Sequence, residues 1–319
     1  MSLGRISHLD QPTLLRIQAA CNYVNAEVAR HRKRVQSAGI VAVALAVLVY
    51  LAMLKQGHQD PRLPLFGAIA IVGLVVQHAR RELRKSYKHI VVQRVVKAIG
   101  NGLVYRPDST LTRDDFNGMH LFDHRAEKWK SEDEICGRKN QVSYSLHECR
   151  ASYEVRSGKR RREVIIFKGV IVRLDFNKNF AGHTVVVTDS QSKLLGGLFG
   201  ESGTRKGKQI VRLENVNFEK QFSVYSSNDQ EARYILTPKL MELIMEAQAL
   251  LGSHGDLRLS FHDNSMFVTV PEPSDRFEVA LFGARVTPEG VMGDLAEMVR
   301  LAERLVETLD LETRIWTRV

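Results

Sequence analysis

Two long apolar stretches near the start of the chain constrain its fold more than any other feature. Residues 37–54 contain no charged side chain, and neither do residues 63–79. At about 1.5 Å per residue, helices of these lengths would span about 27 and 25 Å, close to the hydrocarbon core of a bilayer. A soluble helix normally carries a polar face, and residues 40–50 have none. The sequence therefore predicts a transmembrane helical hairpin, in preference to a buried core hairpin or a cleaved signal peptide.

The positive charge of the chain is concentrated around this hairpin. The formal net charge is +10, and residues 1–89 hold 13 Lys and Arg against 4 Asp and Glu. Because basic residues flank the pair, the positive-inside rule predicts a multi-pass protein of the cell membrane with both termini in the cytoplasm. The side chains expected to set this topology, and to contact anionic lipid head groups, are Arg30, Arg32, Lys33, Arg34, Arg80, Arg81, Arg84, Lys85 and Lys88.

Apolar side chains at heptad-like spacing extend both helices beyond the membrane. The first series is interrupted at His31, and the second ends before Gly100. These helices are expected to pack together as a stalk, or to form a seam with a membrane protein partner or a second copy of the chain. The first series comprises Leu14, Ile17, Cys21, Val24, Val28 and Val35, and the second Tyr87, Ile90, Val91, Val95 and Ala98.

The predicted domains follow from these features. Residues 1–36 form a cytoplasmic amphipathic helix, residues 37–79 the transmembrane hairpin (37–54 and 63–79), residues 80–100 a helical stalk, and residues 101–319 a cytoplasmic domain. In that last region, strand patterns precede helix patterns, which predicts an α+β fold with an antiparallel sheet and C-terminal helices. Strands are expected at 141–155, 163–176, 183–188, 209–213, 222–225, 257–261 and 266–270, with a polar turn at 156–162, and helices at 238–251 and 292–309.

Several short motifs in this domain occur in a characteristic order. They include Ile166-Phe-Lys-Gly169, Asp175-Phe-Asn-Lys-Asn-Phe180, Val224-Tyr-Ser226 and Glu231-Ala-Arg-Tyr-Ile-Leu-Thr-Pro238. Over residues 100–280 the chain resembles the bacterial family called domain of unknown function 3137. The resemblance implies a membrane-anchored protein of unassigned activity, and it supplies no catalytic residues.

The chain offers little sequence evidence of catalysis or cofactor binding. The segment Gly200–Gln209 resembles a phosphate-binding loop but lacks the required Gly and Ser/Thr positions. The three cysteines form no CxxC pair. A metal site built from His120, His124, Cys136, His147 and Cys149 is the alternative to ordinary core or polar histidines, and the latter are expected. We therefore expect no cofactor and no metal.

The residues after His89 are nearly neutral, with 33 basic and 32 acidic side chains, so nucleic acid is not an expected partner. The favoured interpretation is a non-enzymatic integral membrane protein that presents a binding or scaffold domain to a protein or to the lipid surface. The alternative is a membrane-anchored enzyme whose site is assembled from dispersed polar residues. The candidate binding residues are Asp175, Asn177, Lys178, Asn179, Glu231 and Arg233. The basic run at 159–162 and the Gly-rich run at 194–200 are further candidate surface elements.

Overall fold

The chain folds into two compact units. The computed structural model describes residues 11–56, 60–100, 102–140, 142–158, 160–176, 179–188, 204–205, 207–251, 256–272 and 278–313. The first unit combines Met1–Gly100 with Arg276–Asp294, and the second combines Asn101–Asp275 with Leu295–Val319. The sequence predicted a division after residue 100, but it did not anticipate that a later segment belongs with the N-terminal helices.

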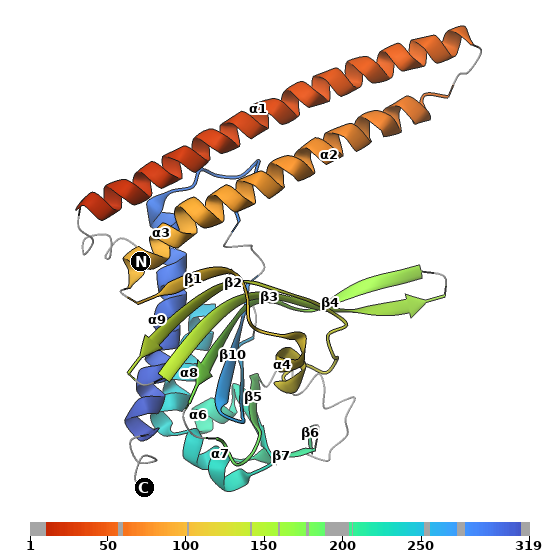
Figure 1. Ribbon diagram of the computed structural model, residues 1–319. Helices are drawn as coiled ribbons and strands as arrows, with labels where there is room; N and C mark the ends of the chain where they lie inside the picture. Colours follow the sequence, from red (N-terminus) through yellow and green to blue (C-terminus); the bar gives the residue numbers. More distant parts are fainter. Residues whose placement is uncertain are drawn as a thin grey trace. The chain divides into compact units, whose positions relative to one another are not determined.

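Two long antiparallel helices form the first unit (Figure 1). α1 spans Gln11–Lys55. The second helix runs from Arg62 to Ile99 as α2 (Arg62–Tyr87), a π-helical turn η2 (Lys88–Val92) and α3 (Gln93–Ile99). The predicted seams lie between them, because the residues of the two apolar series are buried or half-buried within the chain. The buried members are Ile17, Cys21, Val24, Val28, Val35, Tyr87, Val91 and Val95.

The distal parts of both helices expose large apolar side chains. Ile40 is 72% exposed and Leu63 is 73% exposed, and most of their apolar neighbours also face outward. Both helices are long and apolar enough to cross a membrane, judged by length and composition. Of the apolar 18-residue segment in each helix, 6% is buried in α1 and 17% in the second helix. The core hairpin of a soluble protein would bury these side chains, whereas here they are exposed.

A later segment of the chain returns to the helices of the first unit. The side-chain amide of Asn25 donates to the Val286 carbonyl at 2.8 Å and accepts from the Val286 amide at 2.9 Å. The Arg32 guanidinium donates to the Leu281 carbonyl, and Arg84 pairs with Glu278. Leu281 itself is 3% exposed. These contacts satisfy backbone groups that a loop would otherwise leave to water.

The second unit is built on a single antiparallel sheet. Ten described strands pair in the order β1-β2-β3-β4-β10-β9-β5-β8-β7-β6. The mixture of helices with an antiparallel sheet confirms the predicted fold class of this part of the chain. The strands are β1 (Val104–Asp108), β2 (Lys128–Lys139), β3 (Val142–Ser157), β4 (Arg160–Asp175), β5 (Thr184–Thr188), β6 (Thr204–Arg205), β7 (Lys208–Val211), β8 (Phe222–Ser226), β9 (Arg258–His262) and β10 (Ser265–Pro271).

Helices accompany both faces of this sheet. Alternation of side chains along β3 places Tyr144 and Cys149 on opposite faces. The Tyr144 hydroxyl donates to Glu303 of α9 at 2.9 Å, whereas Cys149 packs in the core beneath α4. The helices are α4 (Arg113–Gly118), α6 (Val216–Glu219), α7 (Asp229–Ile235), α8 (Pro238–Leu251) and α9 (Pro288–Thr313).

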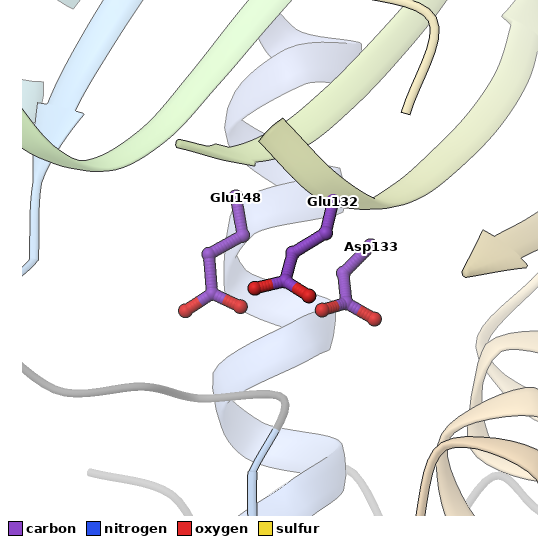
Figure 2. Close-up of side chains that lie close together, drawn as sticks. All are labelled: Glu132, Asp133 and Glu148. Carbon is purple, nitrogen blue, oxygen red and sulfur yellow. The ribbon is translucent and has the colours of Figure 1, made fainter. Parts of the chain in front are cut away.

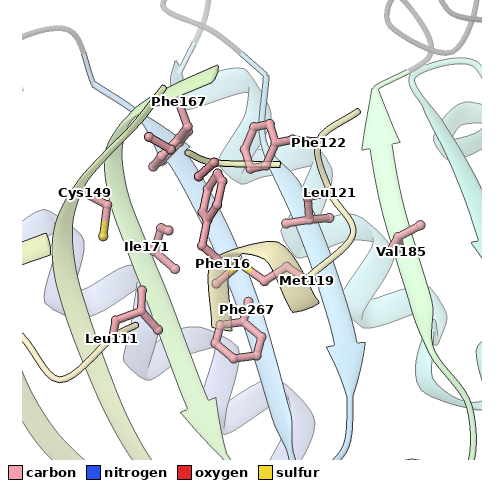
Figure 3. Packing of buried hydrophobic residues seen from close by; sticks show 12 residues of the cluster. Leu111, Phe116, Met119, Leu121, Phe122, Cys149, Phe167, Ile171, Val185 and Phe267 are labelled. Atoms are coloured by element: carbon pink, nitrogen blue, oxygen red, sulfur yellow. The ribbon is translucent and has the colours of Figure 1, made fainter. Parts of the chain in front are cut away.

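An aromatic cluster fills the core on the α4 face (Figure 3). The Phe116 ring stacks on Phe122 at 4.9 Å between ring centroids and lies 4.9 Å from Trp129. α4 begins in a capping box, in which Thr112 accepts from the Asp115 amide and Asp115 accepts from the Thr112 amide. This cap fixes the short helix that carries Phe116 into the core.

The long central hairpin is tighter than the sequence predicted. β3 and β4 remain paired as far as Ser157 and Arg160, so most of the expected turn at 156–162 is strand. Gly158 has φ of 60°, which glycine adopts without strain. Strands β1 and β2 and helix α4 were not predicted. The Gly-rich run at 194–200 lies outside the described residues.

Candidate functional site

The dispersed polar residues predicted as a binding site do not meet in one place. Asp175 ends β4, where its Oδ1 accepts from Ser265 Oγ at 2.8 Å and from Arg173 Nε at 2.7 Å. Asn179 is exposed, and residues 177 and 178 lie outside the described part of the chain. Asp175 therefore bonds to neighbouring side chains and links the end of β4 to the start of β10.

Glu231 and Arg233 of α7 also have separate partners. The Glu231 carboxylate accepts from the backbone amides of Ala181 and Gly182 at 2.7 and 2.6 Å. Arg233 is half-exposed and donates to Asp229 one turn earlier on the same helix at 2.9 Å. Glu231 thus anchors the loop before β5, and Arg233 forms an ordinary surface pair.

The histidines and cysteines considered as metal ligands do not converge on one point in the described part of the chain. The His120 ring stacks on His183 at 4.8 Å, whereas the His124 ring stacks on Tyr153 at 4.2 Å. Cys149 is buried, and its sulfur lies 3.3 Å from Ser131 Oγ. Burial raises the pKa of the Cys149 thiol, which disfavours the thiolate that a metal would need.

A stack of three histidines was missed by sequence reasoning. His183 lies between His120 and His262, with ring centroids 4.8 Å from each, and Lys208 Nζ lies 2.9 Å from His120 Nδ1. Burial, followed by the positive charge of Lys208, lowers the pKa of His183 to about 3. Its Nε2 lies 3.0 Å from Ser260 Oγ. The sheet brings these residues together from distant positions, so no spacing in the sequence could reveal the stack.

A second polar network surrounds His147 inside the sheet domain. His147 Nδ1 lies 2.7 Å from Ser109 Oγ, and its Nε2 lies 2.8 Å from Ser145 Oγ. A serine beside a histidine resembles a nucleophile with its base, but the base then needs an orienting group on its other nitrogen, usually a carboxylate. Here that position is taken by Ser145. Burial lowers the pKa of His147 to about 4, and the side chain is 1% exposed, so the pair fits a satisfied buried network.

Three carboxylates gather at the bulge of β2 (Figure 2). One oxygen each of Glu132, Asp133 and Glu148 lie within 4.8 Å of one another, and Asp133 is fully buried. Such oxygens are the ligands that hard divalent cations prefer. The Tyr105 hydroxyl donates to Asp133, and Lys130 pairs with Glu132, so the cluster already has protein partners. We assign no metal to this cluster.

A basic hairpin arm projects from the sheet (Figure 1). β2 pairs with β3 only as far as Ser152, and β10 pairs with β4 only from Gly169, so the β3–β4 hairpin continues alone beyond them. We call residues 153–157 with 160–164 the arm. At its base, Lys128 lies 2.7 Å from Glu154 and 3.6 Å from Glu163.

The tip of the arm is rich in exposed positive charge. Arg156, Arg160 and Arg162 are exposed, and within the described part of the chain none of them forms an ion pair. Val155 beside them is 40% exposed. Arginine next to exposed apolar side chains is typical of protein interfaces.

The first unit contains a polar cavity of about 260 Å³ between residues 27–34 of α1 and residues 78–86 of α2. It is lined by charged, imidazole and hydroxyl side chains, and one of them is His31, the residue that interrupts the predicted seam. Burial lowers the pKa of His31, and the charge of Arg34 acts in the same direction. The remaining lining residues are Glu27, Arg30, Arg34, His78, Glu82 and Ser86.

Comparison with known proteins supports the resemblance of the sheet domain. Residues 165–311 match the family described as "Protein of unknown function (DUF3137)". The match begins in β4 and ends in α9, later at both ends than the motifs suggested. No curated protein matches the chain.

One solved structure is similar: the crystal structure of the mycobacterial trehalose monomycolate transport factor A, TtfA. The similarity covers 72% of this chain and 97% of that chain, with 12% identity and a TM-score of 0.38. It is too distant to support an inference about a ligand, partner or mechanism.

Proposed function

We propose that this chain is an integral membrane protein whose α1–α2 hairpin anchors a cytoplasmic binding domain. The observation that carries the proposal is the outward exposure of large apolar side chains, such as Ile40 and Leu63, on two stretches of spanning length. Burying this surface in lipid is favourable by about 25 cal/mol per Å². The basic flanks, among them Arg34 and Arg80, favour an orientation with both chain ends in the cytoplasm.

Binding is a better role for the sheet domain than catalysis. Asp175, Glu231 and Arg233 satisfy separate local partners, and the buried His147 has a serine where a catalytic base has its orienting carboxylate. The arm, by contrast, leaves Arg156 and Arg160 available to an acidic surface. We propose that the arm binds a protein partner that carries such a surface.

Fractionation and labelling test the anchor. The full chain should stay with membranes after an alkaline carbonate wash, and Gln56→Cys should react in intact cells with a thiol reagent that does not cross membranes. Recovery in the soluble fraction would refute the anchor. Protection of the introduced cysteine, with reaction only after lysis, would refute the orientation alone.

Copurification from gently solubilised membranes tests the arm. A partner retained by the wild type should be lost from the double variant Arg156→Gln/Arg160→Gln and kept by the control Arg125→Gln/Arg212→Gln, whose side chains are also exposed. Equal retention by both variants would exclude the arm as the binding surface. If only this chain is recovered under all conditions, the binding role itself is wrong.

A further inference from the structure

The cavity between α1 and α2 contains two carboxylates that already have basic neighbours. Glu27 lies 3.7 Å from Arg30, one turn later on α1, and Glu82 lies 3.6 Å from Lys85 on α2. The charges of these pairs largely cancel. The ligand preference of the cavity is therefore set by its other side chains and by the atoms of these pairs that have no partner.

The side chains left over are cationic, titratable or hydroxyl-bearing. Arg34, His78 and Ser86 form no ion pair or hydrogen bond with any residue that the structure describes. An arginine with two histidines and a hydroxyl offers the donors that a phosphate group accepts from. At about 260 Å³, the cavity is slightly smaller than a typical drug-sized pocket, which suits a ligand group of a few heavy atoms.

One oxygen of a carboxylate that lines the cavity also lacks a hydrogen bond. Glu27 Oε1 accepts from the Tyr23 hydroxyl at 3.3 Å and faces Arg30, whereas Glu27 Oε2 is buried and accepts nothing within the described part of the chain. A buried carboxylate oxygen without a donor is costly. A ligand that brings a cationic N–H donor would relieve this cost.

The phosphate donors and the Glu27 carboxylate occupy different levels along the helices. Glu27, His31 and Arg34 are spaced four and three residues apart and share a face of α1. At about 1.5 Å per residue, Arg34 lies about 10 Å closer than Glu27 to the apolar stretch that begins at residue 37. On the antiparallel helix, His78 is the second-last residue of the other apolar stretch, residues 63–79. Phosphate donors therefore lie next to the apolar stretches, and the carboxylate lies farther from them.

We propose that this cavity binds the phosphoethanolamine head group of a membrane lipid. Its phosphate would be held by Arg34 and His78, and its terminal ammonium by Glu27. In such a lipid the phosphate joins the acyl-bearing glycerol and the ammonium lies outermost, which is the order found along the helices. This inference rests on the proposed membrane anchor, because that anchor brings lipid head groups to the level of Arg34.

Lipid binding to the purified full-length chain tests the assignment. The protein in detergent is mixed with phosphatidylethanolamine, phosphatidylcholine or phosphatidylglycerol of identical acyl chains, and bound lipid is counted by native mass spectrometry. Wild type should retain phosphatidylethanolamine about tenfold better than the other two, which lack either the N–H donors or the ammonium. Arg34→Gln should lower that retention about tenfold. Glu27→Gln should remove the preference over phosphatidylglycerol.

The matched control is Lys33→Gln, a neighbouring exposed cation outside the cavity, which should change nothing. Soluble phosphoethanolamine should displace the lipid, and inorganic phosphate should do so only weakly. Equal displacement by inorganic phosphate would overturn the head-group assignment in favour of a simple phosphate site. Equal retention of all three lipids, or no response to Arg34→Gln, would overturn the inference while the chain still sediments with carbonate-washed membranes. Failure of the anchor would instead appear as soluble protein in that wash.

Discussion

Acidification should destabilise the sheet domain through His147. Its side chain is 1% exposed, and burial lowers its pKa from 6.5 to about 4. Above pH 6.5 the histidine is neutral in both the folded and the unfolded states, so it adds no pH dependence. Between pH 6.5 and 4 the imidazole is protonated in the unfolded state and stays neutral in the folded state, so the free energy of unfolding falls as the pH falls.

The size of the effect follows from this difference in pKa. At pH 5 the unfolded imidazole is almost fully protonated and the folded one is almost fully neutral, which costs the folded state about 2 kcal/mol relative to pH 7. His183, with a pKa of about 3, acts in the same direction, and its partial exposure reduces its share. The wild-type loss should therefore exceed that of His147 alone.

Urea unfolding of the full chain in detergent measures this loss. The chain has two tryptophans, so Trp316→Phe leaves Trp129 as the only reporter, and Trp129 packs against the core of the sheet domain. In this background, His147→Gln should lower the unfolding free energy at pH 7 by about 1–3 kcal/mol, because hydrogen bonds to two serines are lost.

The decisive quantity is the change in unfolding free energy between pH 7 and pH 5. His147→Gln should reduce this change by about 2 kcal/mol, since glutamine does not titrate. The control His89→Gln, at an exposed helical position, should keep the wild-type change. If His147→Gln and wild type lose equal stability on acidification, the reasoning from burial is wrong.

Three further substitutions probe other parts of the sheet domain by the same unfolding assay. Phe116→Ala should cost about 3–5 kcal/mol, because the ring is 2% exposed and stacks in the aromatic core. Gly169→Ala should cost about 1–3 kcal/mol or more, because a Cβ there would lie 2.2 Å from the Val270 carbonyl oxygen. Glu231→Gln should cost about 1–3 kcal/mol while leaving partner copurification unchanged, because the carboxylate anchors a loop.

Each of these has its own control or contrary result. Gly118→Ala, where nothing lies within 4 Å of the added Cβ, should be nearly neutral. A Gly169→Ala protein as stable as Gly118→Ala would contradict the close approach of β4 and β10. A loss below about 1 kcal/mol for Phe116→Ala would contradict its burial. Loss of the partner from a well-folded Glu231→Gln protein would restore Glu231 as a binding residue.

The long helices and most strands could be predicted because their signals are local. The seam from Ile17 to Val35 has a repeat that only one helix face can satisfy, and Pro238 with Gly252 delimits a helix by sequence alone. β2 was missed because its Glu132-Asp-Glu134 run has no apolar alternation. That run is accommodated by a bulge with Asp133 at φ of 56°, a conformation that strand patterns do not encode.

The candidate sites were harder to predict because they depend on pairing between distant segments. Glu231 was named as a candidate binding residue among dispersed polar side chains, yet its partners at residues 181 and 182 become visible only once α7 and the loop before β5 are brought together. Only one local feature of the sequence indicated the cavity, the polar His31 in an apolar seam. The residues facing it on α2 could not be inferred without the pairing of the two helices.

The return of residues 276–294 to the first unit has a consequence for the timing of biosynthesis. Asn25 and Arg32 are synthesised about 250 residues before their backbone partners Val286 and Leu281. At roughly 5–20 residues per second, the ribosome needs about 10–40 s to go from residue 100 to residue 294. During this interval the paired helices lack residues 276–294, so the N-terminal unit becomes complete only after the sheet has been synthesised.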